Sequence, residues 1–212
     1  MRKFLISMIA LLTAAVAYAY DFTAECSSGQ TLAYTIIDAS AKTCEVAQPS
    51  EMPSGEVVID ATVVNPDDSE TYTVIGVGPH AFYTAGNVTK VTFPTAATFT
   101  YIGRTTGDHS FRNSGLVGKL IIPDNVTKLG GHVFYETKIT EIQFGTGLTD
   151  IGTMAFKGCQ YLTHVELPNA VTTIGSQSFS SCYNLTYFQM GSNVTTVLGN
   201  SFDYDTKLEK PN

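Results

Sequence analysis

The amino-acid sequence predicts a mainly β solenoid, in which successive coils of the chain stack on one another behind an N-terminal β cap. Three observations predict it. A phenylalanine returns at a nearly constant interval, an apolar residue and usually a glycine precede each one, and strand-forming residues are abundant. Charged residues make up only 15% of the chain, too few for a surface of ordinary charged helices.

The repeat is defined by six phenylalanines that are spaced by 29, 23, 22, 23 and 23 residues. One coil cannot bury its apolar side alone, so like residues of neighbouring coils must stack. We therefore expect the phenylalanines to form a column in the core, and each preceding glycine to allow an unusual backbone angle or a close approach. The six are Phe82, Phe111, Phe134, Phe156, Phe179 and Phe202.

A second apolar group follows each phenylalanine and alternates with polar residues at period two, as in Val165-x-Leu167. This alternation predicts a short strand with one inward face, and stacked strands predict one parallel sheet along the whole rod. The inward groups are Val88, Val91 and Phe93; Val117, Leu120 and Ile122; Ile139, Ile142 and Phe144; Leu162, Val165 and Leu167; and Leu185, Phe188 and Met190.

Residues 20–71 lie outside the repeat and are predicted to form the β cap, whereas residues 72–212 form about six coils, the last one incomplete. The chain stops inside a repeat, so we expect its end either to be blocked by Lys210 and Pro211 or to pair with another chain. The strands expected in the cap are near Thr31–Asp38, Thr43–Ala47 and Glu56–Ile59, and a turn at Asn65–Asp68 precedes the first coil.

Residues 1–19 read as an export signal, with Arg2 and Lys3 ahead of the apolar stretch 4–16 and a cleavage site after Ala19. The apolar stretch is too short to span a bilayer, so we expect secretion without a transmembrane anchor. Removing the signal takes away two of the 12 basic and none of the 19 acidic residues, which changes the formal net charge from −7 to −9. That charge argues against nucleic acid and anionic lipid as partners.

The unit that comprises 171–175 (VTTIG), 179–182 (FSSC) and 185–188 (LTYF) resembles the BspA-type leucine-rich repeat of bacterial surface proteins and some protists. The resemblance covers about residues 72–212 and is strongest over 126–190. The first two repeats depart from it by two and four extra residues between glycine and phenylalanine. It implies a secreted or cell-surface solenoid that binds host or matrix proteins or takes part in adhesion, and it implies no catalytic residues.

The sequence contains no arrangement of residues that is typical of a catalytic site. No cofactor is indicated, and no metal site is indicated because no pair of Cys or His residues has the spacing of metal ligands. Glu141 and Glu166 occupy related strand positions and could face each other as paired carboxylates, but a solvated strand face is the favoured interpretation. The histidines are scattered through the repeats, at His80, His109, His132 and His164.

The four cysteines fall into two pairs. Cys159 and Cys182 share one repeat position, and we expect buried free thiols there rather than a disulfide. Cys26 and Cys44 lie in the cap, where a bond and two free thiols remain equally open. Asn-x-Thr triplets begin at Asn87, Asn125, Asn184 and Asn193, and would accept glycans only in a eukaryotic secretory route.

Period two also predicts which residues point outward and can bind a partner. We expect a binding or adhesion protein that recognises an extracellular protein or matrix ligand. The alternative is a structural component of the cell envelope that associates through residues 203–212. The expected binding face consists of Lys90, Lys119, Glu141, His164, Glu166, Tyr187 and Gln189, together with Thr92, Ile121 and Gln143, and a second, aromatic rim is expected from Tyr83, Tyr135, Tyr161, Tyr183 and Tyr204.

Overall fold

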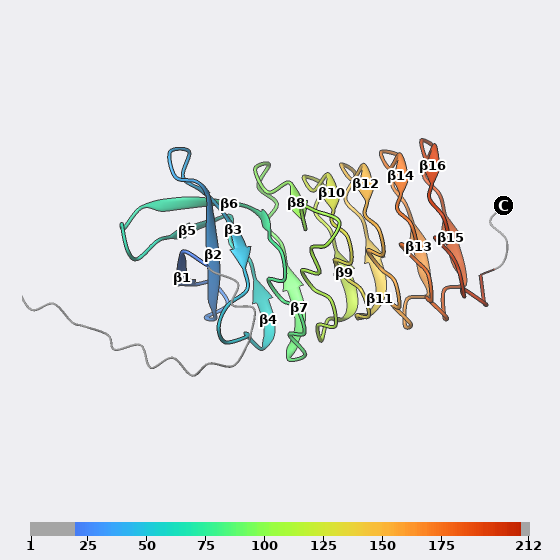
Figure 1. The fold of residues 1–212 in the computed structure, drawn as a ribbon, viewed down its shortest axis with the longest axis horizontal. Coiled ribbons are helices and arrows are strands. Elements are labelled where there is room, and N and C mark those ends of the chain that lie inside the picture. The colour runs from blue at the N-terminus through green and yellow to red at the C-terminus, as the bar shows by residue number, and fades with distance from the viewer. Residues whose placement is uncertain (1–19, 209–212) are drawn as a thin grey trace, which may run out of the picture.

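The structure, a computed structural model, describes residues 20–208, and this part of the chain consists of strands and turns without a helix (Figure 1). The expected export signal and residues 209–212 lie outside it. The strands are β1 (Phe22–Glu25), β2 (Thr31–Asp38), β3 (Thr43–Ala47), β4 (Gly55–Val58), β5 (Thr62–Val64), β6 (Thr71–Val77), β7 (Val88–Thr92), β8 (Tyr101–Ile102), β9 (Val117–Ile121), β10 (Lys128–Leu129), β11 (Lys138–Gln143), β12 (Asp150–Ile151), β13 (His164–Glu166), β14 (Thr173–Ile174), β15 (Tyr187–Gln189) and β16 (Thr196–Val197).

The coils stack into a solenoid with parallel strands on two of its sides (Figure 1). One sheet runs along the rod through β6, β8, β10, β12, β14 and β16, each pair parallel and the later strands only two residues long. On another side β9, β11, β13 and β15 pair in parallel, and β4 pairs with β7 as a separate sheet. The predicted mainly β solenoid is therefore confirmed.

The prediction of one uninterrupted sheet is wrong, because the hydrogen-bonded ladder breaks between β7 and β9. Gly118 has a left-handed backbone (φ 77°), so the entry to β9 does not follow the regular alternation. Val117 is consequently 54% exposed, contrary to its predicted inward position, and Leu116 is buried nearby. Met190 is also exposed rather than buried, because it follows the edge strand β15.

The phenylalanine column is confirmed. From Phe82 to Phe179 every ring of the column is fully buried, and successive ring centroids lie 4.7–5.4 Å apart with interplanar angles of 8–17°. Phe202 extends the column at 6.0 Å. Offset stacks of this kind stabilise the core beyond the apolar area that they bury, so each coil is anchored to the next through one aromatic contact.

The glycines ahead of the phenylalanines are needed mainly because neighbouring coils approach closely. A Cβ atom on Gly130, Gly152 or Gly175 would lie 2.5–2.8 Å from the carbonyl carbon of the equivalent glycine in the preceding coil. Of the glycines at this repeat position, only Gly103 has a left-handed backbone, with φ 75°. The close approach therefore leaves no room for a side chain at Gly130, Gly152 and Gly175, whereas the last coil has Leu198 at this position.

The segments that contain the column phenylalanines stack without forming strands. Met154, Phe156 and Gly158 donate their backbone N–H groups to carbonyl oxygens of the next coil at 2.8–2.9 Å. Residues two before and two after the phenylalanine have left-handed backbones, with φ 55° at Met154 and 74° at Gly158. With these backbone angles the N–H groups of every second residue point along the rod toward the next coil. The same pattern recurs in the other coils. It places non-glycine residues in a conformation that they seldom adopt.

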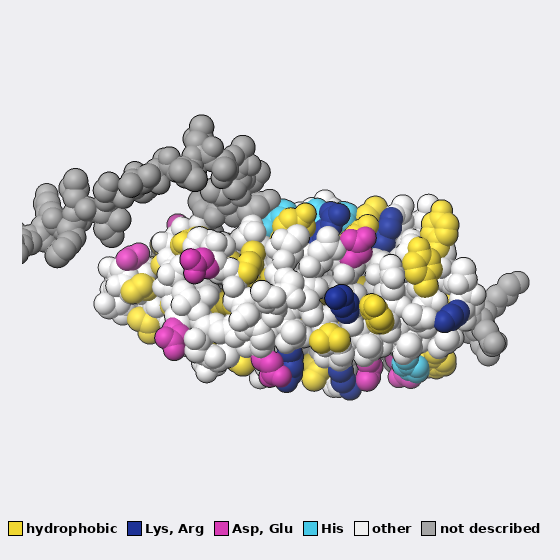
Figure 2. Space-filling model, turned by 90° about the horizontal axis from the view of Figure 1, so that it is seen from below, with side chains coloured by type: hydrophobic (Ala, Val, Ile, Leu, Met, Phe, Trp, Pro, Cys, Tyr) yellow, Lys and Arg dark blue, Asp and Glu magenta, His cyan; other side chains and the backbone are white. Residues whose placement is uncertain are grey.

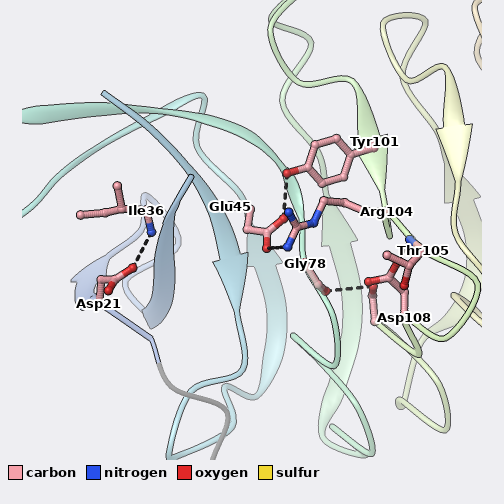
Figure 3. Close-up of polar contacts among 9 residues, drawn as sticks. Asp21, Ile36, Glu45, Gly78, Tyr101, Arg104, Thr105 and Asp108 are labelled. Carbon is pink, nitrogen blue, oxygen red and sulfur yellow. Dashed lines mark hydrogen bonds and ion pairs between the residues drawn. The ribbon is translucent and has the colours of Figure 1, made fainter. Parts of the chain in front are cut away.

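The cap continues directly into the solenoid. The expected cap strands at 31–38 and 43–47 coincide with β2 and β3, the third begins one residue earlier, and β1 and β5 were not predicted. β1, β2 and β3 pair antiparallel, whereas β3 pairs in parallel with β6, so the cap sheet is continuous with the first coil. The buried carboxylate of Glu45 joins the two parts by accepting hydrogen bonds from Tyr101 at 2.7 Å and Arg104 at 2.8 Å (Figure 3).

Candidate functional site

The predicted binding face lies mainly on the four-stranded sheet of β9, β11, β13 and β15. All seven predicted side chains are exposed, because inward and outward residues alternate along each strand. The parallel register pairs Lys119 with Glu141, Glu141 with His164, and His164 with Tyr187. These four side chains therefore form one row across four coils, which we call the sheet row.

Side-chain contacts hold the sheet row in place. Lys119 Nζ lies 2.9 Å from Glu141 Oε1, and the rings of His164 and Tyr187 stack at 4.3 Å with an interplanar angle of 4°. His164 Nε2 lies 2.9 Å from Glu166 Oε1, and the Tyr187 hydroxyl donates to Gln189 Oε1 at 2.7 Å. Exposed pairs contribute little stability, but they restrict the rotamers that a partner would meet.

The structure does not bring Lys90 into this row. Lys90 belongs to β7, which pairs only with β4 among the described strands, and its ammonium group lies 3.2 Å from Glu56. Two apolar side chains of β9 adjoin the row instead, and the sequence predicted only one of them to be exposed. Ile121 is 52% exposed as expected, and the misassigned Val117 is 54% exposed, so both ends of β9 present apolar surface.

Paired carboxylates do not form on this face. The register sets Glu141 opposite His164 and Glu166 opposite Gln189, so the two carboxylates do not face each other across the sheet. Each instead contacts a basic or imidazole side chain at 2.9 Å. The solvated strand face is therefore the correct interpretation of these two glutamates.

The tyrosines do not form a single aromatic rim. Tyr83 and Tyr135 directly follow column phenylalanines and are half-buried, whereas Tyr161, Tyr183 and Tyr204 lie at other offsets from their phenylalanines and are 43–70% exposed. No two of the five rings contact each other in residues 20–208. A rim requires the same repeat position in successive coils, and only Tyr83 and Tyr135 share one.

Three histidines that are far apart in the sequence lie side by side, with their rings tilted against one another by 37–39°. His80, His109 and His132 each lie two residues before a column phenylalanine, with ring centroids 5.4 and 4.4 Å apart. All three have left-handed backbones, with φ of 50–58°. Counting back from the phenylalanines would have found this shared position in the sequence.

The cysteines are all buried and free, which agrees with the interpretation of Cys159 and Cys182 and shows no bond between Cys26 and Cys44. Cys159 Sγ and Cys182 Sγ each donate to a carbonyl oxygen of the preceding coil, at 3.2 and 3.3 Å. Burial raises the pKa of the Cys159 thiol to about 12. Over residues 20–208 no group of three or more His, Cys, Asp or Glu residues is arranged to hold a metal ion, and no helix is long and apolar enough to cross a membrane.

The stacked coils, the phenylalanine column and the exposed parallel sheet define a leucine-rich-repeat β-solenoid. The chain belongs to the family of the BspA type leucine rich repeat region, whose repeat matches six times over residues 75–209. The resemblance recognised in the sequence is thereby confirmed. A comparison with curated proteins gives no match.

Solved structures share the fold. A leucine-rich cell surface protein from Faecalibacterium prausnitzii has 22% sequence identity and a TM-score of 0.63. The match covers 91% of this chain and 55% of the Faecalibacterium chain. A leucine-rich repeat protein from Bacteroides ovatus is 21% identical with a TM-score of 0.56, over 91% of this chain and 52% of its own. The leucine-rich repeat protein of T. pallidum has 18% sequence identity and a TM-score of 0.60, and the match covers 84% of this chain and 87% of the T. pallidum chain. This chain thus spans about half the length of the first two.

Proposed function

We propose that the chain is an exported, surface-associated repeat protein that binds an extracellular or matrix protein through the sheet row and the apolar side chains beside it. The observation that carries the proposal is the alignment of Lys119, Glu141, His164 and Tyr187 across four hydrogen-bonded strands. A rigid array loses little conformational freedom on binding. Its mixture of charge, aromatic surface and exposed apolar residues is typical of protein interfaces.

The proposed location rests on two observations. The first 19 residues have the three parts of an export signal, and one structural neighbour is described as a cell surface protein. The mature chain would carry a net charge of −9, which favours solubility and disfavours nucleic acid. We propose a non-enzymatic role, because repeat solenoids usually act through extended surfaces rather than clefts.

The experiment compares two quadruple alanine variants of the mature protein in solid-phase binding to solubilised extracellular-matrix proteins. The test variant changes the sheet row. The matched control changes the equivalent row of the other long sheet, where Lys128, Asp150, Thr173 and Thr196 occupy successive register positions on β10, β12, β14 and β16. Both variants should keep the melting temperature nearly unchanged, because all the substituted residues except the half-buried Thr173 are exposed, and exposed substitutions usually alter stability by within about 0.5 kcal/mol each.

We expect binding to fall at least tenfold in the sheet-row variant and to persist in the control. Loss in the control alone would move the binding surface to the other sheet. Retention by both, together with concentration-dependent self-association in sedimentation experiments, would favour the structural role over ligand binding.

A further inference from the structure

A second cluster of functional side chains lies along an edge that the sheet row does not use. It combines the position two residues before the column phenylalanine with the position directly after it, and all its members are partly exposed. Figure 2 shows histidine side chains beside hydrophobic and basic ones along one long edge of the molecule. We call this set the histidine edge; it consists of His80, Tyr83, His109, Arg112, His132, Tyr135 and Lys157.

Arg112 lies at the centre of the histidine edge and has no carboxylate partner among the described residues. Its guanidinium group lies 4.6 Å from the centroid of the Tyr135 ring, and its Nη1 atom lies 3.5 Å from His109 Nδ1. Its Nε atom is buried without a hydrogen-bond partner. Arg104, in contrast, forms an ion pair with Glu45 at 2.8 Å. Arg112 is thus a fixed, unneutralised cation in an acidic protein, the arrangement that favours a bidentate carboxylate.

The imidazoles beside Arg112 are neutral at physiological pH. Burial, followed by the neighbouring His132, Arg112 and His80, lowers the pKa of His109 to about 4. Burial also lowers the pKa of His132, which faces Arg112 and Lys157 while its Nδ1 lies 3.2 Å from the Thr106 carbonyl oxygen. Burial lowers the pKa of His80 too, against the opposing effect of Asp108, and the carboxylate of Glu136 acts on Tyr135 and on the buried Cys159. His132 Nδ1–H donates to the Thr106 carbonyl oxygen, and His109 Nδ1 accepts from Arg112. A bound anion would therefore meet the Nε2–H donor of His109 and one fixed positive charge.

The backbone of this edge is not available to a peptide strand. The N–H groups of His80, His109 and His132 already donate to carbonyl oxygens of the next coil, at 2.8, 3.2 and 2.9 Å. A peptide that binds by strand addition needs free main-chain groups, whereas a sugar needs side-chain donors and aromatic surface. A metal cation is disfavoured because the Arg112 charge lies against His109.

We propose that the histidine edge binds the carboxylate of an acidic sugar. Arg112 forms the charged pair with the carboxylate, His109 donates a hydrogen bond to the same group from Nε2, and the half-buried Tyr83 ring, 6.2 Å from the His109 ring, contacts the sugar. This site is separate from the sheet row, so it does not depend on the function proposed above.

The test measures binding of a galacturonate oligomer to the mature protein by calorimetry at pH 6. Three comparisons are built in: a neutral galactose oligomer of equal length, poly-L-glutamate, and the sheet-row variant. Arg112→Lys and Arg112→Ser remove the bidentate donor, and Lys157 and Ser180 occupy the same repeat position, so both residues fit this backbone. We expect each substitution to weaken galacturonate binding by about tenfold or more, because hydrogen bonds to charged groups are strong. The sheet-row variant should bind normally.

A bound carboxylate also favours protonation of the adjacent imidazoles, so affinity should rise as the pH falls from 7.5 to 5.5, by at most about tenfold per pH unit for each proton taken up. His109→Gln combined with His132→Gln should abolish this rise, and Gln177 occupies the same position with φ 55°. Melting temperatures verify that each variant is folded. Equal binding of the neutral oligomer, or unchanged affinity in both Arg112 variants, would overturn the proposal. Tighter binding of poly-L-glutamate would replace the sugar by an acidic peptide.

Discussion

Replacing Phe156 by Ala tests the stacking column most directly. The ring is fully buried between Phe134 and Phe179, at centroid distances of 5.4 and 5.3 Å, and Phe144 packs edge-on at 5.8 Å. An aromatic side chain buries about 150–250 Å², which at about 25 cal/mol per Å² corresponds to roughly 4–6 kcal/mol. Measured losses for such truncations are about 3–5 kcal/mol, because the cavity relaxes only partly. We expect the free energy of unfolding to fall by about 4 kcal/mol.

The assay is urea denaturation followed by far-ultraviolet circular dichroism, in which the midpoint should fall while the slope is preserved. Tyr161→Ala is the control, because its ring is 55% exposed and its loss should cost less than about 1 kcal/mol. Phe202→Ala should be intermediate, since that ring stacks on Phe179 alone within the column, at 6.0 Å. Equal and mild effects of all three substitutions would refute the assignment of the column.

Three further predictions concern single positions. Burial, more than the nearby Asp203, raises the pKa of Asp205 from 3.8 to about 7 although the Cys182 N–H group lowers it. A folded pKa above the unfolded value contributes stability that is present at low pH and is lost as the pH rises through about 7. Asp205→Asn should therefore exceed the parent in stability at pH 8, by on the order of 2–4 kcal/mol, and match it near pH 4; parallel pH profiles would contradict this. Gly152→Ala should lower the melting temperature strongly, because its Cβ would lie 2.6 Å from backbone atoms of the preceding coil, whereas Gly107→Ala meets nothing within 4 Å and should be neutral. The Cys159 thiol should not react with Ellman's reagent at pH 8 until guanidinium unfolds the protein, and rapid reaction in the native state would show that the site is open.

The sequence by itself determined the repeat, the core column and most of the strand alternation. Column residues such as Phe134 and Phe156 recur because each coil must place the same side chain over its neighbour, so their spacing records the stacking directly. The outward positions on β11, β13 and β15 follow from period two, which depends only on local strand geometry. The resemblance to BspA-type repeats rests on the same residues.

The tertiary structure alone decided where regularity fails and which side chains meet. The left-handed backbone of Gly118 interrupts the alternation beside the exposed Val117, and a period-two pattern contains no information on backbone handedness. The alignment of His164 with Tyr187 depends on the register between coils, which no single strand specifies. Within residues 20–208, the neighbouring coils place the Tyr135 ring and the His109 imidazole, and no carboxylate partner, beside the charge of Arg112. Contacts between coils arise from stacking in three dimensions, so a linear pattern can indicate the positions but not the interactions that form there.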